Sequence, residues 1–249
     1  MLVENKFIYL SLPRCASTSF LITCLRNNIE IKHYDKFYVE NMDRTIDLSL
    51  DNEKLADQLL HGHEKIVDLR TKFGYELPVV GIKRNRHDRF ISLWKHLIDL
   101  TATLTHLYDP KVSEILSQLD IEDVLFFNSE DLIPEDKTKL ADRFIEKSGV
   151  SEYINKNNYF HFRAIILITI NPLSYFHNND PNIIWFEYDK LYEFEKWVSE
   201  MLERPFKLEK SNSSQTFKCN LTISRDSFIR KYNEIYDYFD LPKNVTSLI

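Results

Sequence analysis

The segment from Phe7 to Phe20 constrains the fold of this chain more than any other. It begins with four apolar residues prone to β-structure, and a hydroxyl cluster from Ser17 to Ser19 follows Pro13 and Arg14. Apolar residues then recur at helical spacing, which predicts a helix. A strand, a short polar loop and a helix in succession aim backbone N–H groups at an anion on the helix N-terminus. Because Arg14 adds positive charge there, the pattern predicts a site for a phosphate or a phosphosulfate.

The loop in this segment differs from that of the nucleoside triphosphatases, Gly-x-x-x-x-Gly-Lys-Ser/Thr, because it contains neither Gly nor Lys. It resembles the 5′-phosphosulfate loop of the sulfotransferases, in particular that of the uronyl 2-O-sulfotransferases, which runs Pro-Lys-Thr-Ala-Ser-Thr-Ser-Phe. In this chain Arg14 replaces the Lys and Cys15 replaces the Thr. The alternative is an ordinary helix start with Ser/Thr capping. The matching positions are Pro13, Ala16, Ser17, Thr18, Ser19 and Phe20.

A second group of residues lies between 78 and 98, where a short buried strand is followed by apolar residues on one face of a helix. Five cationic residues gather here although the whole chain has a net charge of −6. An anionic ligand at the C-terminal end of the strand explains such a local field. Sulfotransferases carry a 3′-phosphate motif here, an Arg and a Ser eight residues later, and the resemblance assigns it to Arg84 and Ser92. The family places Asp-Pro where this chain has Asn85 and Arg86, and the alternative is a solvated basic helix face.

Two histidines, His61 and His63, flank a glycine between these two groups. The uronyl enzymes show a His-Gly-His, a Phe-Gly and a Pro in this order, and this chain has Phe73, Gly74 and Pro78. The resemblance implies that a His deprotonates the acceptor hydroxyl, a role that suits an unperturbed pKa of about 6.5. It assigns the base to His63, with His61 orienting it or contacting the acceptor, or the reverse. A metal-ligand pair and a polar loop are the alternatives, although no further ligand stands at convincing spacing.

The composition bounds the class of protein. A chain of 249 residues with 43% hydrophobic content suits one α/β domain over residues 1–249. We expect no membrane span, since no apolar run approaches ~20 residues, and the N-terminal segment has the pattern of neither a signal peptide nor an anchor. Three cysteines without a CxxC motif favour a reducing, cytoplasmic location. The acidic net charge argues against a nucleic-acid partner.

Hydrophobic periodicity predicts the elements along the rest of the chain. We expect strands at 6–11, 78–83, 164–170 and 183–187. We expect helices at 17–28, 86–104, 136–147, 190–203 and 227–238, and a mainly helical segment over 105–160. The polar loop at 210–215 has the composition of any surface loop, and sulfotransferases often place an Asn/Ser loop there that approaches the nucleotide.

The resemblance as a whole implies an α/β fold with a P-loop-type parallel β-sheet flanked by helices. It implies in-line transfer of a sulfuryl group from 3′-phosphoadenosine 5′-phosphosulfate (PAPS) to an acceptor hydroxyl, on a carbohydrate such as a glycan, without a metal. Arg14 would neutralise charge on the bridging oxygen as the sulfur–oxygen bond breaks. A phosphotransferase with an unusual P-loop and a non-catalytic nucleotide-binding protein of the same fold are the alternatives. The residues implied to bind the 5′-phosphosulfate are Arg14, Cys15, Ala16, Ser17, Thr18 and Ser19.

Overall fold

The protein is described by a computed structural model that places residues 1–32, 64–105, 107–119, 137–156, 158–159, 162–163, 166, 174–178 and 180–209. By their internal packing the residues form two compact units. The first unit comprises Met1–Arg84 and Leu173–Ser213, and the second comprises Asn85–Pro172 and Ser214–Ile249. Each unit has a hydrophobic core of its own. The assignment of residues 1–249 to a single domain stays a prediction.

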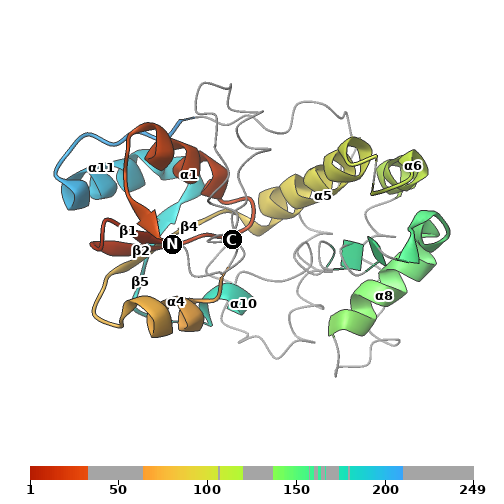
Figure 1. Cartoon of the computed structure of the whole chain (residues 1–249), viewed down its shortest axis with the longest axis horizontal. Helices are drawn as coiled ribbons and strands as arrows, with labels where there is room; N and C mark the ends of the chain where they lie inside the picture. Colours follow the sequence, from red (N-terminus) through yellow and green to blue (C-terminus); the bar gives the residue numbers. More distant parts are fainter. Residues whose placement is uncertain are drawn as a thin grey trace. The chain divides into compact units, whose positions relative to one another are not determined.

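The first unit is built on a five-stranded sheet with the strand order β3-β1-β2-β4-β5 (Figure 1). The strands β2 (Phe7–Leu10), β4 (Val79–Lys83) and β5 (Ile183–Glu187) run parallel. The short strands β1 (Leu2–Val3) and β3 (Ile31–Lys32) are antiparallel to their neighbours. The expectation of a parallel sheet is therefore right for β2, β4 and β5 and wrong for β1 and β3, which make the sheet mixed.

Helices cover both faces of this sheet. Every residue of β2 is buried, as are the first four of β4, which is why these strands read as continuous apolar runs. Figure 1 shows α1 (Ser17–Arg26) and α11 (Leu191–Leu202) on one face, and α4 (Ile66–Phe73) and α10 (Ser174–His177) on the other. The first unit is thus an α/β structure with a core on each side of the sheet.

Gly81 in the middle of β4 is required by its neighbour on β5. The two strands pair in parallel with Gly81 opposite Trp185. A Cβ atom at Gly81 would lie only 2.6 Å from Cζ3 of the Trp185 ring. The missing side chain lets the indole lie against β4, so a glycine inside a strand marks a close approach.

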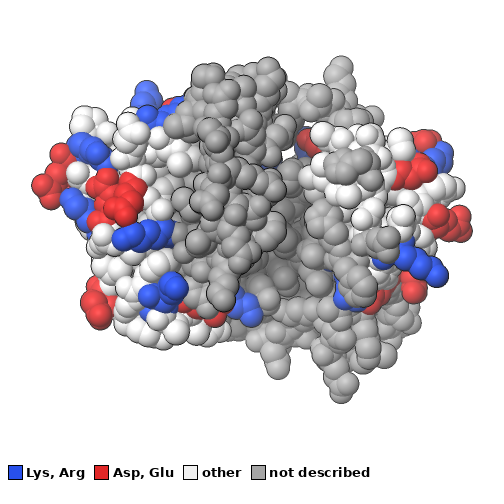
Figure 2. Space-filling model, in the orientation of Figure 1, with Lys and Arg blue, Asp and Glu red and all other residues white. Residues whose placement is uncertain are grey.

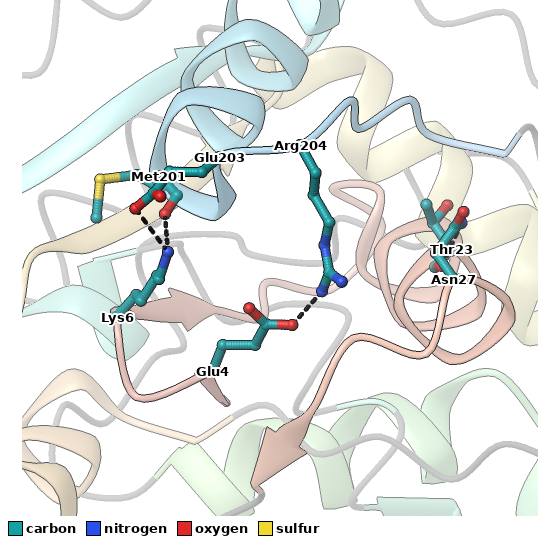
Figure 3. A network of polar contacts seen from close by, with 7 residues as sticks. All are labelled: Glu4, Lys6, Thr23, Asn27, Met201, Glu203 and Arg204. Atoms are coloured by element: carbon teal, nitrogen blue, oxygen red, sulfur yellow. Dashed lines mark hydrogen bonds and ion pairs between the residues drawn. The ribbon is translucent and has the colours of Figure 1, made fainter.

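The β1–β2 hairpin is tied to the end of α11, as Figure 3 shows. In its turn, Glu4 and Asn5 adopt φ angles of 44° and 53°. The Lys6 ammonium donates to the Met201 carbonyl at 2.9 Å and lies 3.2 Å from a Glu203 carboxylate oxygen. Glu4 forms an ion pair with the arginine that follows Glu203. These contacts join the first residues of the chain to a segment about 200 positions later.

The second unit is helical in its described residues. It contains α5 (Arg86–Thr103), α6 (Pro110–Gln118), α8 (Lys137–Lys147) and the 3-10 turn η2 (Val150–Tyr153). Its core includes the edge-to-face pair of Trp94 and Phe144, whose ring centroids are 5.9 Å apart. Ile166, the described residue within the predicted strand 164–170, is helical, so the strand prediction is wrong there. A short apolar run fits a buried helix as well as a buried strand.

The described surface of the face drawn in Figure 2 carries basic and acidic side chains beside one another. Ion pairs on the protein surface include Lys111–Glu114 and Lys196–Glu200. Such exposed pairs contribute about 0–1 kcal/mol each, so they shape the surface more than the stability. No helix in the part of the chain that the structure describes is long and apolar enough to cross a membrane.

Candidate functional site

The C-terminal ends of β2 and β4 meet at one edge of the sheet. The two strands are parallel neighbours, with Leu10 opposite Gly81. The β2–α1 loop, residues 11–16, follows β2, and Arg84 follows β4 directly. Ligands of open α/β sheets bind outside the carboxyl ends of the strands. The fold therefore brings the loop with Arg14 and the candidate 3′-phosphate ligand Arg84 to the same edge of the first unit.

The backbone of the β2–α1 loop is unusual for residues with side chains. Arg14 and Ala16 adopt the left-handed conformation, with φ of 61° and 63°, which few residues other than glycine do. The Cys15 N–H donates to the Leu12 carbonyl at 3.2 Å and closes the turn between them. Successive N–H groups in such alternating conformations form anion-binding concavities. The chain thus builds, without a glycine, a loop of the kind that glycine-rich sequences usually supply.

Side chains of the loop and the first helical turn alternate between the interior and the surface. Cys15 and Ser17 are buried, whereas Arg14, Ala16, Thr18 and Ser19 are half-buried. The Ser17 hydroxyl donates to the Leu12 carbonyl at 2.7 Å, and the Cys15 thiol lies 3.6 Å from the Pro13 carbonyl. Both side chains thus contact the loop itself, so the donor that Ser17 offers a ligand is its backbone N–H.

The start of α1 is not an ordinary capped helix. Its N-cap residue is Ala16, which makes no side-chain capping bond, and the first turn contains no acidic residue. An ordinary start would place a Ser, Thr, Asp or Asn at the N-cap, but here the hydroxyl residues lie inside the first turn. The N–H groups of Ala16 and Ser17 have no hydrogen-bond partner among the described residues. The positive end of the helix dipole therefore carries N–H donors that suit an anion.

Arg84 lies against an aromatic ring at this edge. Its guanidinium carbon is 4.6 Å from the centroid of Tyr188, which follows β5. The neighbouring Lys83 forms an ion pair with Glu187 at 2.9 Å, whereas Arg84 has no carboxylate partner among the described residues. Sequence reasoning missed Tyr188, although the parallel register of β4 and β5 places the residues after Lys83 and Glu187 side by side.

Ser92, the second residue of the proposed 3′-phosphate motif, is half-buried on α5. It belongs to the second unit and Arg84 to the first, so their joint action on one phosphate stays a prediction. Asn85 precedes α5, and its side-chain oxygen accepts from the Asp88 N–H at 3.4 Å. The residue that replaces the family's Asp therefore still caps this helix, and Arg86 occupies the first helical position that a Pro would also suit.

The candidate bases His61 and His63 lie outside the described residues, as do the loop at 210–215 and the predicted helix at 227–238. Within the ranges that the structure does describe, no group of three or more His, Cys, Asp or Glu residues could hold a metal ion. The assignment of the general base therefore stays a prediction from the resemblance.

A second polar cluster lies at the opposite edge of the sheet. The Arg70 side chain on α4 pairs with Asp180 at 2.9 Å and donates to the Tyr75 carbonyl at 3.0 Å. Tyr75 and Asp180 stand in the segments that lead into β4 and β5. The His177 ring lies edge-on to Trp185, and its burial lowers the pKa of His177 to about 4, against the opposing effect of Asp180. This cluster joins segments of the fold and lies away from the loop.

Comparisons with known proteins found no relative of this chain. No protein-family model, no curated protein and no solved structure matches the chain. The function therefore has to be inferred from the residues and the geometry of the edge that carries Arg14 and Arg84.

Proposed function

We propose that the protein is a PAPS-dependent O-sulfotransferase that transfers a sulfuryl group to a hydroxyl, with a carbohydrate as the favoured acceptor. One observation supports this most. The loop that resembles the sulfotransferase 5′-phosphosulfate loop has a left-handed backbone at Arg14 and Ala16, and it shares a sheet edge with Arg84. A loop and an arginine at one edge suit a ligand with phosphates at both its 5′ and 3′ positions.

The two phosphates of the nucleotide would bind to different groups. The N–H groups of Ala16 and Ser17, at the positive end of α1, suit the 5′-phosphate, with Thr18 and Ser19 in the same turn. Arg84 suits the 3′-phosphate, because a guanidinium binds phosphate with two parallel hydrogen bonds. The Tyr188 ring lies 4.6 Å from the guanidinium carbon and supports Arg84 without balancing its charge. The resemblance also assigns Ser92 to this phosphate, a role that stays a prediction.

In the proposed reaction the bond between sulfur and the bridging phosphate oxygen breaks, and a bond forms between sulfur and the acceptor oxygen. Arg14 would stabilise the negative charge that grows on the bridging oxygen. The hydroxyl proton would pass to His63, or to His61 if the roles are reversed. The product nucleotide is adenosine 3′,5′-bisphosphate, whose phosphates remain bound to cations and N–H donors, so no metal is needed to stabilise it.

The buried thiols of Cys15 and Cys24 are both free, and free thiols suit a reducing compartment such as the cytoplasm. Burial also raises the pKa of the Cys24 thiol, which keeps it protonated and unreactive. We therefore assign the thiols no part in the reaction.

The decisive binding experiment measures thermal stabilisation by two ligands. Adenosine 3′,5′-bisphosphate should raise the melting temperature, since a ligand at 100 times its Kd adds about 2.7 kcal/mol. ATP with Mg²⁺ should have little effect. Stabilisation by ATP with Mg²⁺ alone would overturn the proposal and favour a phosphotransferase. Incubation with radiolabelled PAPS and a glycan extract then separates an enzyme from a non-catalytic nucleotide-binding protein.

The role of the histidines is tested by comparing His63→Ala with His61→Ala. Loss of the base should lower kcat by about 10²–10⁴ and leave the affinity for the product nucleotide unchanged, because the base touches the acceptor. The wild-type rate should fall at low pH as the imidazole protonates. An inactive His61→Ala beside an active His63→Ala would reverse the two roles, and two active variants would exclude both.

A further inference from the structure

Tyr9 lies beneath the β2–α1 loop. It belongs to β2 and is fully buried. Its ring stacks on Phe20 in the first turn of α1, with centroids 4.0 Å apart. Its hydroxyl donates to the Cys15 carbonyl at 3.3 Å. A single core side chain thus contacts both the loop backbone and the helix that follows it.

The bond from Tyr9 fixes the direction of a neighbouring donor. The Cys15 carbonyl and the Ala16 N–H belong to one peptide unit. Peptide bonds in the described chain are trans, so the carbonyl and the N–H of a unit point in opposite directions. With the carbonyl directed at the buried Tyr9 hydroxyl, the Ala16 N–H points away from the core. It is one of the two N–H groups at the helix start that have no partner among the described residues.

A second hydroxyl, that of Ser17, also holds a carbonyl of the loop. Ser17 donates to the Leu12 carbonyl at 2.7 Å, and the same carbonyl accepts the Cys15 N–H at 3.2 Å. Two carbonyl oxygens that would repel an anion are therefore held toward the interior. The loop presents donors outward because hydroxyl groups beneath it hold its acceptors inward.

We propose that Tyr9 is a positioning residue of the PAPS site, which orients the Cys15–Ala16 peptide so that its N–H faces the 5′-phosphate; this inference rests on the proposed function. Without the hydroxyl the peptide is free to rotate, and a carbonyl oxygen can then face the phosphate. Burial raises the pKa of Tyr9 far above its usual value, so the hydroxyl stays protonated and remains a donor. The bond is longer than the roughly 2.7–2.8 Å typical of hydroxyl donors, so the expected effect is moderate.

The test compares Tyr9→Phe with the wild type by calorimetry on three nucleotides. Adenosine 3′,5′-bisphosphate and adenosine 5′-phosphosulfate both carry a 5′-phosphate and should bind about 3- to 10-fold more weakly to the variant. Adenosine 3′-monophosphate lacks that group and should bind equally well to both proteins. Tyr108→Phe is the matched control, since Tyr108 is a buried tyrosine of the second unit, and it should change none of the three affinities.

A purely structural role for Tyr9 predicts a different result. Equal weakening for all three nucleotides, or none for any of them, would overturn the positioning role. Ser17→Ala removes the other inward hydroxyl and should show the same selectivity for the 5′-phosphate. If the wild type binds none of the nucleotides, the proposed function fails. The crystal structure of Tyr9→Phe then decides the inference alone, because a rotated Cys15–Ala16 peptide supports it and an unchanged one refutes it.

Discussion

Two arginines of the first unit lie against tyrosine rings at opposite edges of the sheet, and their surroundings differ. Arg70 is 5.9 Å from the Tyr75 ring and forms an ion pair with Asp180 at 2.9 Å. Arg84 is 4.6 Å from the Tyr188 ring, without a carboxylate partner among the described residues. The first charge is balanced within the protein, as expected of an arginine that joins parts of a fold. The second lies against an aromatic ring and has no such balance among the described residues. The edge with Arg84 is therefore the one at which the proposed function expects an anion.

The largest effect, a loss of stability, is expected from replacing Arg70, whose charge is paired with Asp180. Only 8% of the Arg70 side chain and 18% of the Asp180 side chain are exposed. Arg70→Leu leaves a largely buried carboxylate without its partner and should lower the free energy of unfolding by about 2–4 kcal/mol. Urea denaturation measures this loss.

The double variant Arg70→Leu/Asp180→Leu is the control, since it removes both charges and should recover part of the stability. The affinity for adenosine 3′,5′-bisphosphate should stay the same in both variants. A selective loss of nucleotide affinity in Arg70→Leu would break the comparison, because it would assign a ligand to both edges.

The converse is expected at the other edge. Arg84→Ala should weaken the binding of adenosine 3′,5′-bisphosphate by about 1.5–3 kcal/mol and leave adenosine 5′-phosphosulfate nearly unaffected. The free energy of unfolding of this variant should fall by no more than about 0.5–1 kcal/mol, the value of the lost contact with Tyr188. Lys83→Ala is the matched control, because the Lys83 charge is balanced by Glu187. Calorimetry on both nucleotides checks the difference, and an equal loss for both would show that Arg84 supports the fold or the 5′ site.

The sequence predicts the three parallel strands, whose ends form both edges, but it does not predict the whole sheet. The apolar runs at 6–11, 78–83 and 183–187 form β2, β4 and β5, because strands buried on both faces are continuously apolar. The hairpin of β1 was missed, since its turn has Glu4 and Asn5 with positive φ in place of the usual Asn-Gly signal. The contact between Glu4 and the end of α11 (Figure 3) is made by residues far apart in the chain, which a local pattern cannot reveal.

The candidate site was predictable in its residue types and not in its geometry. The hydroxyl cluster and Arg14 predict an anion-binding loop, but nothing in the local sequence indicates the left-handed backbone at Ala16. Nor does the sequence reveal that Ser17 turns inward to Leu12. The support from Tyr188 depends on the pairing of β4 with β5, which lie about 100 residues apart. Such features arise from tertiary contacts.

The edge that carries Arg70 and Asp180 should also make the stability of the protein depend on pH, through His177. Burial lowers the pKa of His177 to about 4, below the roughly 6.5 of an unfolded chain. Between these values the unfolded state binds more protons, so stability should fall as the pH falls from about 6.5 toward 4. With His177 only partly buried, the loss between pH 7 and 5 should be about 1 kcal/mol. Urea denaturation at both pH values measures it, and His177→Gln should reduce the difference; an unchanged difference would assign the titration to another group.

The smallest effect distinguishes the two tyrosines. A cation over an exposed aromatic ring gains about 0.5–1 kcal/mol. Tyr188→Leu removes the support beneath Arg84 and should weaken adenosine 3′,5′-bisphosphate by about 2- to 5-fold, whereas Tyr188→Phe keeps the ring and should bind as the wild type does. Tyr75→Leu is the counterpart at the other edge, where Tyr75 is 64% exposed. This variant should lower the free energy of unfolding slightly and leave the nucleotide affinity unchanged. Calorimetry and urea denaturation on the three variants decide the matter. If Tyr188→Phe binds as weakly as Tyr188→Leu, the hydroxyl and not the ring supports the ligand, and the two edges differ in more than the balance of their arginine charges.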